Sequence, residues 1–173
     1  MQTENIYSPH NISLIKRTLF VLVGIFLWQS SGANKNTKEY CAVTQKEMAK
    51  MQEQLPMSVD ASGLLVGVNA IYINDVCYKN YIYSIDTEKF VQIIKKSELT
   101  YTEAYSWLKT TDGRIQLISL MNENVSNFVQ LRLGGNNSKS LRKLKIKEKM
   151  IFTYNFDDPS ILPVEVVAVD TTQ

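Results

Sequence analysis

The stretch LLVGVNAIYINDVCYKNYIYSID, residues 64–86, decides the fold that this sequence predicts. Its valine, isoleucine and tyrosine content favours β-strands. Asn74 and Asp75 tolerate positive φ angles, so this pair suits a tight reversal between two strands. The stretch therefore predicts a β-hairpin with Cys77 just past its turn. The alternation along the second strand predicts that three side chains share one face: Tyr81, Tyr83 and Ile85.

An apolar segment near the N-terminus predicts export. Lys16 and Arg17 precede an uncharged, mostly apolar run at residues 18–28, and small polar residues follow, which is the pattern of a secretory signal peptide. Ser31 and Ala33 occupy positions −3 and −1 of a cut before residue 34. The run covers about 11 residues, whereas a membrane-spanning helix needs about 20. We therefore expect residues 1–33 to be a signal peptide and residues 34–173 to be a single α+β domain. An uncleaved N-terminal membrane anchor is the alternative.

The segments on both sides of the hairpin predict helices. Residues 37–55 have helical spacing, with Thr37 as the N-cap and Pro56 as the stop. The apolar face of this helix would consist of Tyr40, Val43, Met48, Met51 and Leu55. Residues 86–97 predict a short amphipathic helix capped by Asp86 or Thr87. Residues 98–114 predict another helix, which Asp112 and Gly113 would end.

The last third of the chain predicts more strands. Residues 115–121 are open between helix and strand, and a strand is favoured for residues 128–133 because the turn sequence GGNN follows. Residues 150–156 and 164–170 predict two strands around the Asp158-Pro159 turn. The fold class is therefore α+β, with the N-terminal helix and the central helices packed on one mainly antiparallel sheet built from two hairpins.

The chain has two cysteines, Cys41 and Cys77. An exported chain meets an oxidising compartment, and an even cysteine count there predicts one disulfide. The bond would join the N-terminal helix to the hairpin and close a loop of about 35 residues, which contributes roughly 3–4 kcal/mol by the chain-entropy argument. The alternative is a reactive thiol, which needs a nearby histidine, a helix N-terminus or a Cys-x-x-Cys partner to lower its pKa.

The mature chain has no histidine, because the only one, His10, lies in the leader. This excludes Ser-His-Asp and Cys-His hydrolysis and the commonest zinc and copper sites. Carboxylate chemistry stays open, and Asp157 and Asp158 are the only conspicuous acidic pair, although aspartate in a turn is favoured for geometry alone. We predict no catalytic residue, no metal site and no cofactor.

Residues 139–149 are the most charged stretch of the chain. Six basic residues occur there: Lys139, Arg142, Lys143, Lys145, Lys147 and Lys149. Leu144 and Ile146 alternate with lysines, so we expect one face of a strand to pack and the other to present a basic stripe. The stripe would bind an anionic envelope polymer, a lipid or an acidic protein, with Arg142, Lys143, Lys145 and Lys147 as the candidate residues. A lysine-protected edge strand is the alternative.

Tyrosines are concentrated in the hairpin and in the helices that follow it. An exposed tyrosine surface suits protein recognition, so Tyr78, Tyr81 and Tyr83 are further candidate binding residues. The alternative is that many of these side chains form the core and its rim.

The segment LPMSVD, at residues 55–60, leads into the apolar hairpin with its Tyr-x-Tyr strand. Together with a preceding cysteine-bearing helix and a late strand, this resembles small exported bacterial α+β proteins of unknown function. The resemblance implies an α+β fold and an exported location, and it carries no catalytic motif.

Three functions are compatible with these patterns. The first is a periplasmic or secreted protein-binding module, similar to an immunity protein or to an accessory of a secretion apparatus. The second is a small secreted hydrolase that uses carboxylates, and the third is an envelope accessory tethered to the inner membrane. A protein is the expected partner, and nucleic acid is not, because export removes the chain from it.

Overall fold

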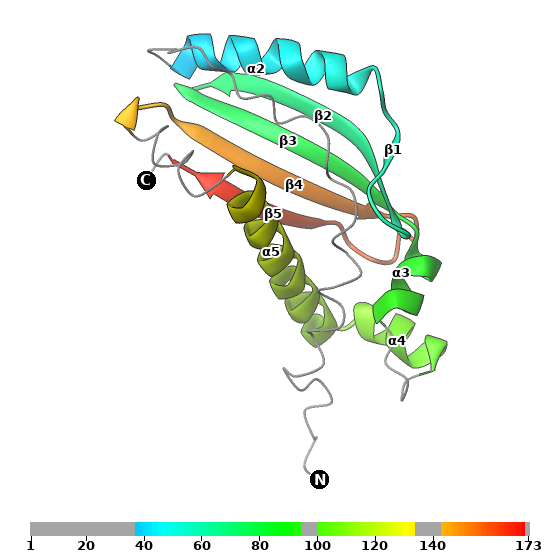
Figure 1. Ribbon diagram of the computed structural model, residues 1–173. Helices are drawn as coiled ribbons and strands as arrows, with labels where there is room; N and C mark the ends of the chain where they lie inside the picture. Colours follow the sequence, from blue (N-terminus) through cyan, green and yellow to red (C-terminus); the bar gives the residue numbers. More distant parts are fainter. Residues whose placement is uncertain (1–36, 95–99, 134–142, 172–173) are drawn as a thin grey trace.

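Five strands and four helices form the part of the chain that the computed structural model describes, namely residues 37–94, 100–133 and 143–171 (Figure 1). The α+β class is therefore confirmed. The helices are α2 (Thr37–Gln52), α3 (Thr87–Ile94), α4 (Tyr101–Leu108) and α5 (Thr111–Leu133). The strands are β1 (Met57–Ser58), β2 (Gly63–Ile73), β3 (Val76–Ile85), β4 (Glu148–Phe156) and β5 (Val164–Asp170). The leader prediction lies outside the described residues.

The strands are ordered β1-β2-β3-β4-β5, and every neighbouring pair is antiparallel except β3 and β4. The hairpin β2–β3 turns at Asn74 and Asp75, whose φ angles are 51° and 63°, as the sequence predicts. β4 and β5 pair in the same antiparallel sense around the Asp158-Pro159 turn. The two hairpins join through the parallel pair, because α3, α4 and α5 carry the chain back to the start of β4.

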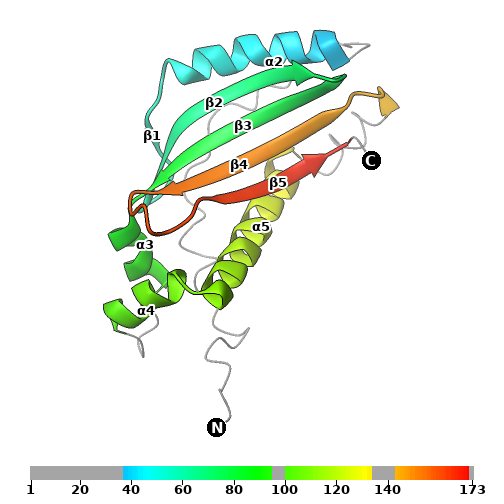
Figure 2. The ribbon, with the colours of Figure 1, turned by 180° about the vertical axis from the view of Figure 1, so that it is seen from behind.

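Only one face of the sheet carries the core. Apart from Val76 beside the turn, the buried positions of β2 and β3 face the same side, and this set includes Leu65, Val68, Cys77, Tyr83 and Ile85. α2 packs against β2 and β3, α5 packs against β5, and their buried side chains belong to the same cluster. Figure 2 shows the sheet from behind, with α5 on its far side. We call the side that bears these helices the core face and the other side the open face.

The predicted apolar face of residues 37–55 is confirmed except at Val43. Met48 is buried, and Tyr40, Met51 and Leu55 pack against the core. The buried residues of α2 are Thr37, Cys41, Thr44 and Met48, which recur at the helical repeat. Val43, which we expected on the apolar face, is exposed. Two threonines also take part in the buried stripe, which hydrophobicity alone does not predict.

The region after α4 is a correction to the sequence-based prediction. Asp112 and Gly113 lie in the first turn of α5 instead of ending a helix, and the Thr110 hydroxyl accepts a 3.0 Å hydrogen bond from the Gly113 amide. A Cβ atom at Gly113 would lie 1.9 Å from the carbonyl oxygen of Trp107, so α4 and α5 can meet this closely only at glycine. α5 then continues to Leu133, so the strand expected at residues 128–133 is wrong.

Candidate functional site

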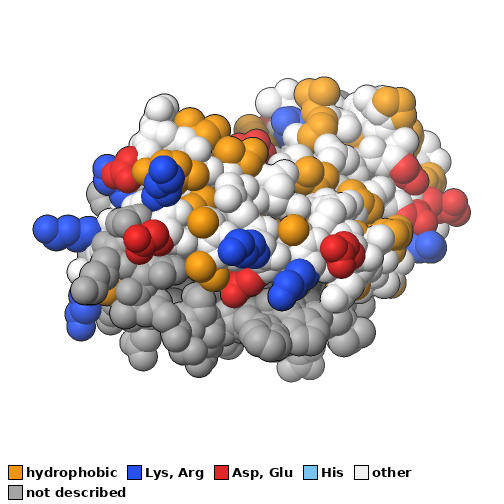
Figure 3. Space-filling view, turned by 90° about the horizontal axis from the view of Figure 1, so that it is seen from above, with side chains coloured by type: hydrophobic (Ala, Val, Ile, Leu, Met, Phe, Trp, Pro, Cys, Tyr) orange, Lys and Arg blue, Asp and Glu red, His pale blue; other side chains and the backbone are white. Residues whose placement is uncertain are grey.

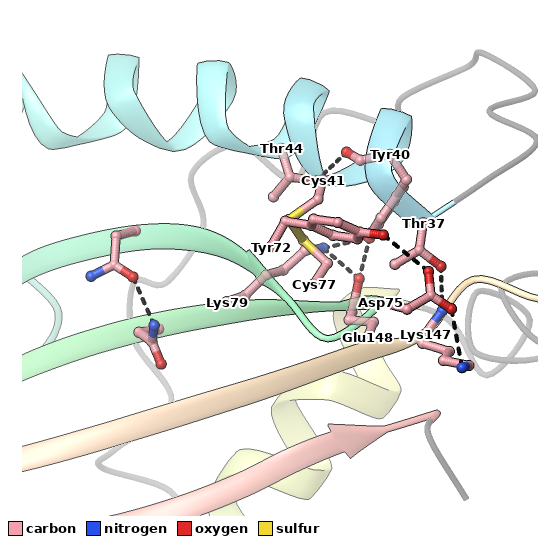
Figure 4. The surroundings of a disulfide bond; sticks show 12 residues. Thr37, Tyr40, Cys41, Thr44, Tyr72, Asp75, Cys77, Lys79, Lys147 and Glu148 are labelled. Carbon is pink, nitrogen blue, oxygen red and sulfur yellow. Dashed lines mark hydrogen bonds and ion pairs between the residues drawn. A yellow bond between two sulfur atoms is a disulfide. The ribbon is translucent and has the colours of Figure 1, made fainter.

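The two cysteines form the disulfide that the sequence predicts. Cys41 of α2 and Cys77 of β3 are bonded, with their Cα atoms 5.3 Å apart, and both are fully buried (Figure 4). Cys77 lies directly after the turn of the hairpin, so the bond fixes the first part of α2 to one end of the sheet. Neither cysteine is free, which removes the alternative of a reactive thiol in this structure.

A buried ion pair lies beside the disulfide. The Lys79 ammonium is 2.8 Å from a carboxylate oxygen of Glu148, and the two side chains are only 12% and 2% exposed. The Tyr40 hydroxyl donates a hydrogen bond to the same carboxylate and accepts one of 2.6 Å from Lys79. We call these three residues the ion cluster; they come from α2, β3 and β4 (Figure 4).

Local hydrogen bonds hold the ion cluster in place. The Glu148 amide donates to the Thr171 hydroxyl over 2.7 Å, and the Lys147 amide donates to the Thr37 hydroxyl over 3.1 Å. Burial, reinforced by the neighbouring Glu148 carboxylate, raises the pKa of Tyr40, so its phenol stays protonated and donates. Because all three groups satisfy one another in a buried position, the cluster holds three elements together, which is a structural task.

The candidate tyrosines are divided between the two faces of the sheet. Tyr83 is 4% exposed on the core face, and Tyr81, also on that face, stacks on Phe152 with ring centroids 4.9 Å apart. Burial raises the pKa of Tyr81 to about 12. Tyr78 has the opposite parity and is half-buried on the open face. Alternation along β3 therefore puts Tyr81 and Tyr83 on the core face, as the alternative of a core role expects, and leaves Tyr78 on the open face.

The basic stripe is not a strand face. Arg142 and Lys139 lie outside the described residues, and β4 begins only at Glu148. Lys143 and Lys145 are exposed, whereas the Lys147 ammonium is 3.0 Å from a carboxylate oxygen of Asp75. β4 lies between β3 and β5, so the alternative of a lysine-protected edge strand is also wrong. The predicted alternation holds from Lys145 to Met150, with Ile146 buried and Glu148 on the same buried side, but Leu144, which we expected to pack, is exposed.

The acidic pair anchors helices. Asp157 accepts a 2.9 Å hydrogen bond from the Thr87 amide at the start of α3, where a carboxylate also meets the positive end of the helix dipole. Asp158 accepts from the Tyr105 hydroxyl of α4 and, over 2.8 Å, from the Ser160 amide. These contacts explain why both aspartates are present without assigning them a catalytic role.

Protonation of Asp158 is expected to destabilise the folded protein in acid. The hydrogen bond from Tyr105, assisted by those from Ser160, lowers the pKa of Asp158 to about 2. Its proton is bound more weakly in the folded state, so its contribution is complete at neutral pH and is lost as the pH falls from about 4 to about 2. Asp158→Asn should therefore lower the free energy of unfolding at about pH 6, and the difference from wild type should shrink toward pH 2. Urea titrations across this range measure it. An equal difference at both ends would contradict the assignment, and Tyr105→Phe should weaken the same pH dependence.

A hollow of about 230 Å³ lies at the end of the sheet where β3 passes into α3. Three of its lining residues are acidic: Asp60, Asp86 and Asp157. Each carboxylate already accepts a local hydrogen bond, from Ser62, Lys89 and Thr87 respectively. Within the described ranges, no group of three or more histidine, cysteine or acidic residues could hold a metal ion. In the same part of the chain, no helix is long and apolar enough to cross a membrane.

The open face is a feature that sequence reasoning missed. Its apolar members, paired across the strands, are Leu64, Ile71, Ile73, Ile82, Ile151 and Val167. Several are strongly exposed, including Ile71 at 44% and Ile73 at 49%. Between them lie Asn69 and Asn80, whose side-chain amides hydrogen-bond to each other over 2.7 Å. The period-2 pattern of residues 67–73 could have shown this face, but nothing in the sequence says which parity the helices cover.

Charge is nearly absent from the open face. The residues that β2 and β3 contribute to it are all uncharged. The charged residues are confined to β4 and β5, where Lys149 and Asp170 lie 4.0 Å apart and Glu165 is exposed. The outer side of α2 differs from the open face, because charged lysine and glutamate side chains are exposed along it (Figure 3). The uncharged area is therefore particular to one side of the molecule.

Comparison with known proteins gives no information on function, so the fold and the open face are the basis for a functional proposal. No protein-family model, no curated protein and no solved structure matches this chain.

Proposed function

We propose that the chain is an exported protein-binding module and that the open face is its docking surface. The observation that carries this proposal is a sheet face with exposed isoleucine and valine side chains, to which β2 and β3 contribute only uncharged residues. Export is supported by the leader at residues 1–33. The resemblance to small exported α+β proteins points to the same location.

Physical chemistry favours docking at such a face. Apolar side chains gain free energy when a partner removes them from water, at about 25 cal/mol per Å². The centres of protein interfaces are depleted of charged residues, and contiguous exposed apolar patches on soluble proteins mark interaction sites. The Asn69–Asn80 pair satisfies its own central hydrogen bond, so covering it costs less than covering two free amides.

Docking is favoured over hydrolysis for a second reason. A carboxylate hydrolase needs one carboxyl group that donates a proton and another that acts as base or nucleophile. The aspartates of the hollow and the pair at residues 157–158 already accept hydrogen bonds from the loops and helix ends around them. Those contacts assign them to the fold.

Site-specific crosslinking tests the proposed function. A photoreactive residue is placed at Ile71 or Val167 on the open face, and at Ile115 of α5 as the control, which is 60% exposed on the other side of the sheet. After expression of the complete chain and irradiation of intact cells, we expect the two open-face positions to give the same protein adduct and Ile115 to give none of it. Mass spectrometry identifies the adduct.

Two results of the crosslinking experiment would contradict the proposed function. No adduct from Ile71 and Val167, or the same adduct from all three positions, would overturn the docking surface. N-terminal sequencing of the recovered chain distinguishes cleavage from tethering, because a cleaved chain starts at residue 34.

A further inference from the structure

We infer that the open face binds the open face of a second copy of this chain, so that two sheets stack in a two-fold dimer. The inference rests on the proposed function and names its partner. Sheets that pack face to face lie about 10 Å apart with their strands about 30° from parallel, and a two-fold interface uses the same surface on both copies. The surface must therefore be complementary to itself in charge, shape and area.

Charge permits self-association. A contact centred near β3 would bring together the uncharged parts of β2 and β3 from both copies. The charged corner formed by Lys149, Glu165 and Asp170 would lie at the periphery, where Lys149 and Asp170 already pair with each other. The formal net charge of the whole chain is only +2, so two copies repel each other weakly.

Side chains cover the open face along both strands of the hairpin. Ile82 lies beside Gly67, and its side chain is 3.3 Å from the position that a Cβ atom would take there, so the glycine leaves no recess. In the next rows Asn69 pairs with Asn80 and Ile71 with Tyr78. Stacked sheets contact each other through such rows of side chains.

The area of the open face is close to that of a standard interface. Four strands, β2 to β5, at about 4.8 Å spacing are roughly 19 Å wide, and about nine residues at about 3.3 Å each extend roughly 30 Å. The flat area is thus about 600 Å², and side-chain relief adds to it. Standard interfaces bury about 800 Å² of accessible surface on each partner, so the flat area of the open face approaches the size of a standard interface.

The oligomeric state of the purified chain tests this inference. The complete chain is expressed, recovered and studied by sedimentation equilibrium up to about 100 μM. We expect the mass of two chains, with Ile71→Lys and Val167→Lys each raising the dissociation constant at least about 100-fold, because the dimer would bury an unpaired ammonium. Ile115→Lys is the matched control and should leave the dimer unchanged. Circular dichroism confirms that each variant is folded.

Three results would overturn the inference. The first is a monomer at the highest concentration, and the second is a dimer that Ile71→Lys leaves intact. The third is a crosslinked adduct at Ile71 that contains a different protein while the purified chain is monomeric; in that case the proposed function stands and only the partner is wrong. A monomer without any adduct overturns both.

Discussion

Replacing Lys79 with methionine is expected to destabilise the protein by about 3–5 kcal/mol, the usual cost of leaving one member of a buried ion pair without its partner. Glu148 is 1% exposed, so its carboxylate would have to remain ionised in a poorly solvated site or take up a proton. A loss of this size is a large part of the roughly 5–15 kcal/mol that holds a typical domain folded. Urea unfolding, followed by circular dichroism, measures it.

Lys89→Met is the matched control for this experiment. Lys89 is also paired with a carboxylate, that of Asp86, at 2.8 Å, but its side chain is 64% exposed. Exposed pairs contribute little, so the control should lose much less stability than Lys79→Met. The double variant Lys79→Met with Glu148→Leu should recover much of the stability, because it removes both charges together. Equal losses for Lys79→Met and Lys89→Met would contradict the account of the ion cluster.

Removing the disulfide is the second change with a large expected effect. Cys41→Ala combined with Cys77→Ala should lower the free energy of unfolding by about 3–4 kcal/mol, because the bond joins residues 36 positions apart and restricts the unfolded chain. Both sulfur atoms are fully buried, so the smaller side chains also leave space in the core. Denaturant titration of the wild-type and double-variant chains measures the difference.

A reducing agent provides the internal control. It should lower the urea midpoint of the wild-type chain and leave that of the double variant unchanged, since only the first has a bond to reduce. Mass measurement after alkylation without reductant checks the starting state. Two alkylated cysteines in the native exported protein would contradict the assignment. A wild-type urea midpoint that the reductant leaves unchanged would also contradict it.

The hairpin could be predicted because its signals are local. Asn74 and Asp75 lie next to each other, and both adopt the positive φ angles that their side chains tolerate. Tyr81, Tyr83 and Ile85 do share a face, as alternation requires. The pairing of β3 with β4 could not be predicted, because residues more than 60 positions apart meet there and no turn chemistry connects them.

The end of α5 shows where local signals fail. Residues 128–133 contain valine, phenylalanine and leucine, which suit a buried strand and a buried helix equally well. These residues are helical because they belong to α5, which packs on β5 on the core face. That choice depends on the tertiary structure, which overrides propensity.

The ion cluster was missed for a related reason. Glu148 lies among lysines, and such a run is ordinarily solvated. Its parity is informative in retrospect, since Glu148 shares a face with Met150 and Phe152, while Lys79 shares one with Cys77 and Tyr81. Recognising a buried charge pair from the sequence would have required knowing that β3 and β4 are neighbours.

The parallel pair at the centre of the sheet has a consequence for how the chain folds. α2 and the hairpin β2–β3 are contiguous in sequence, and their cysteines both precede the long crossover, so this half can assemble and oxidise first. β4 arrives only after α3, α4 and α5, and contacts of such sequence separation slow folding. Until it arrives, Lys79 lacks its carboxylate and the edge of β3 is unpaired. Insertion of β4, with Glu148 as its first residue, is therefore the step that completes the sheet and neutralises its buried lysine.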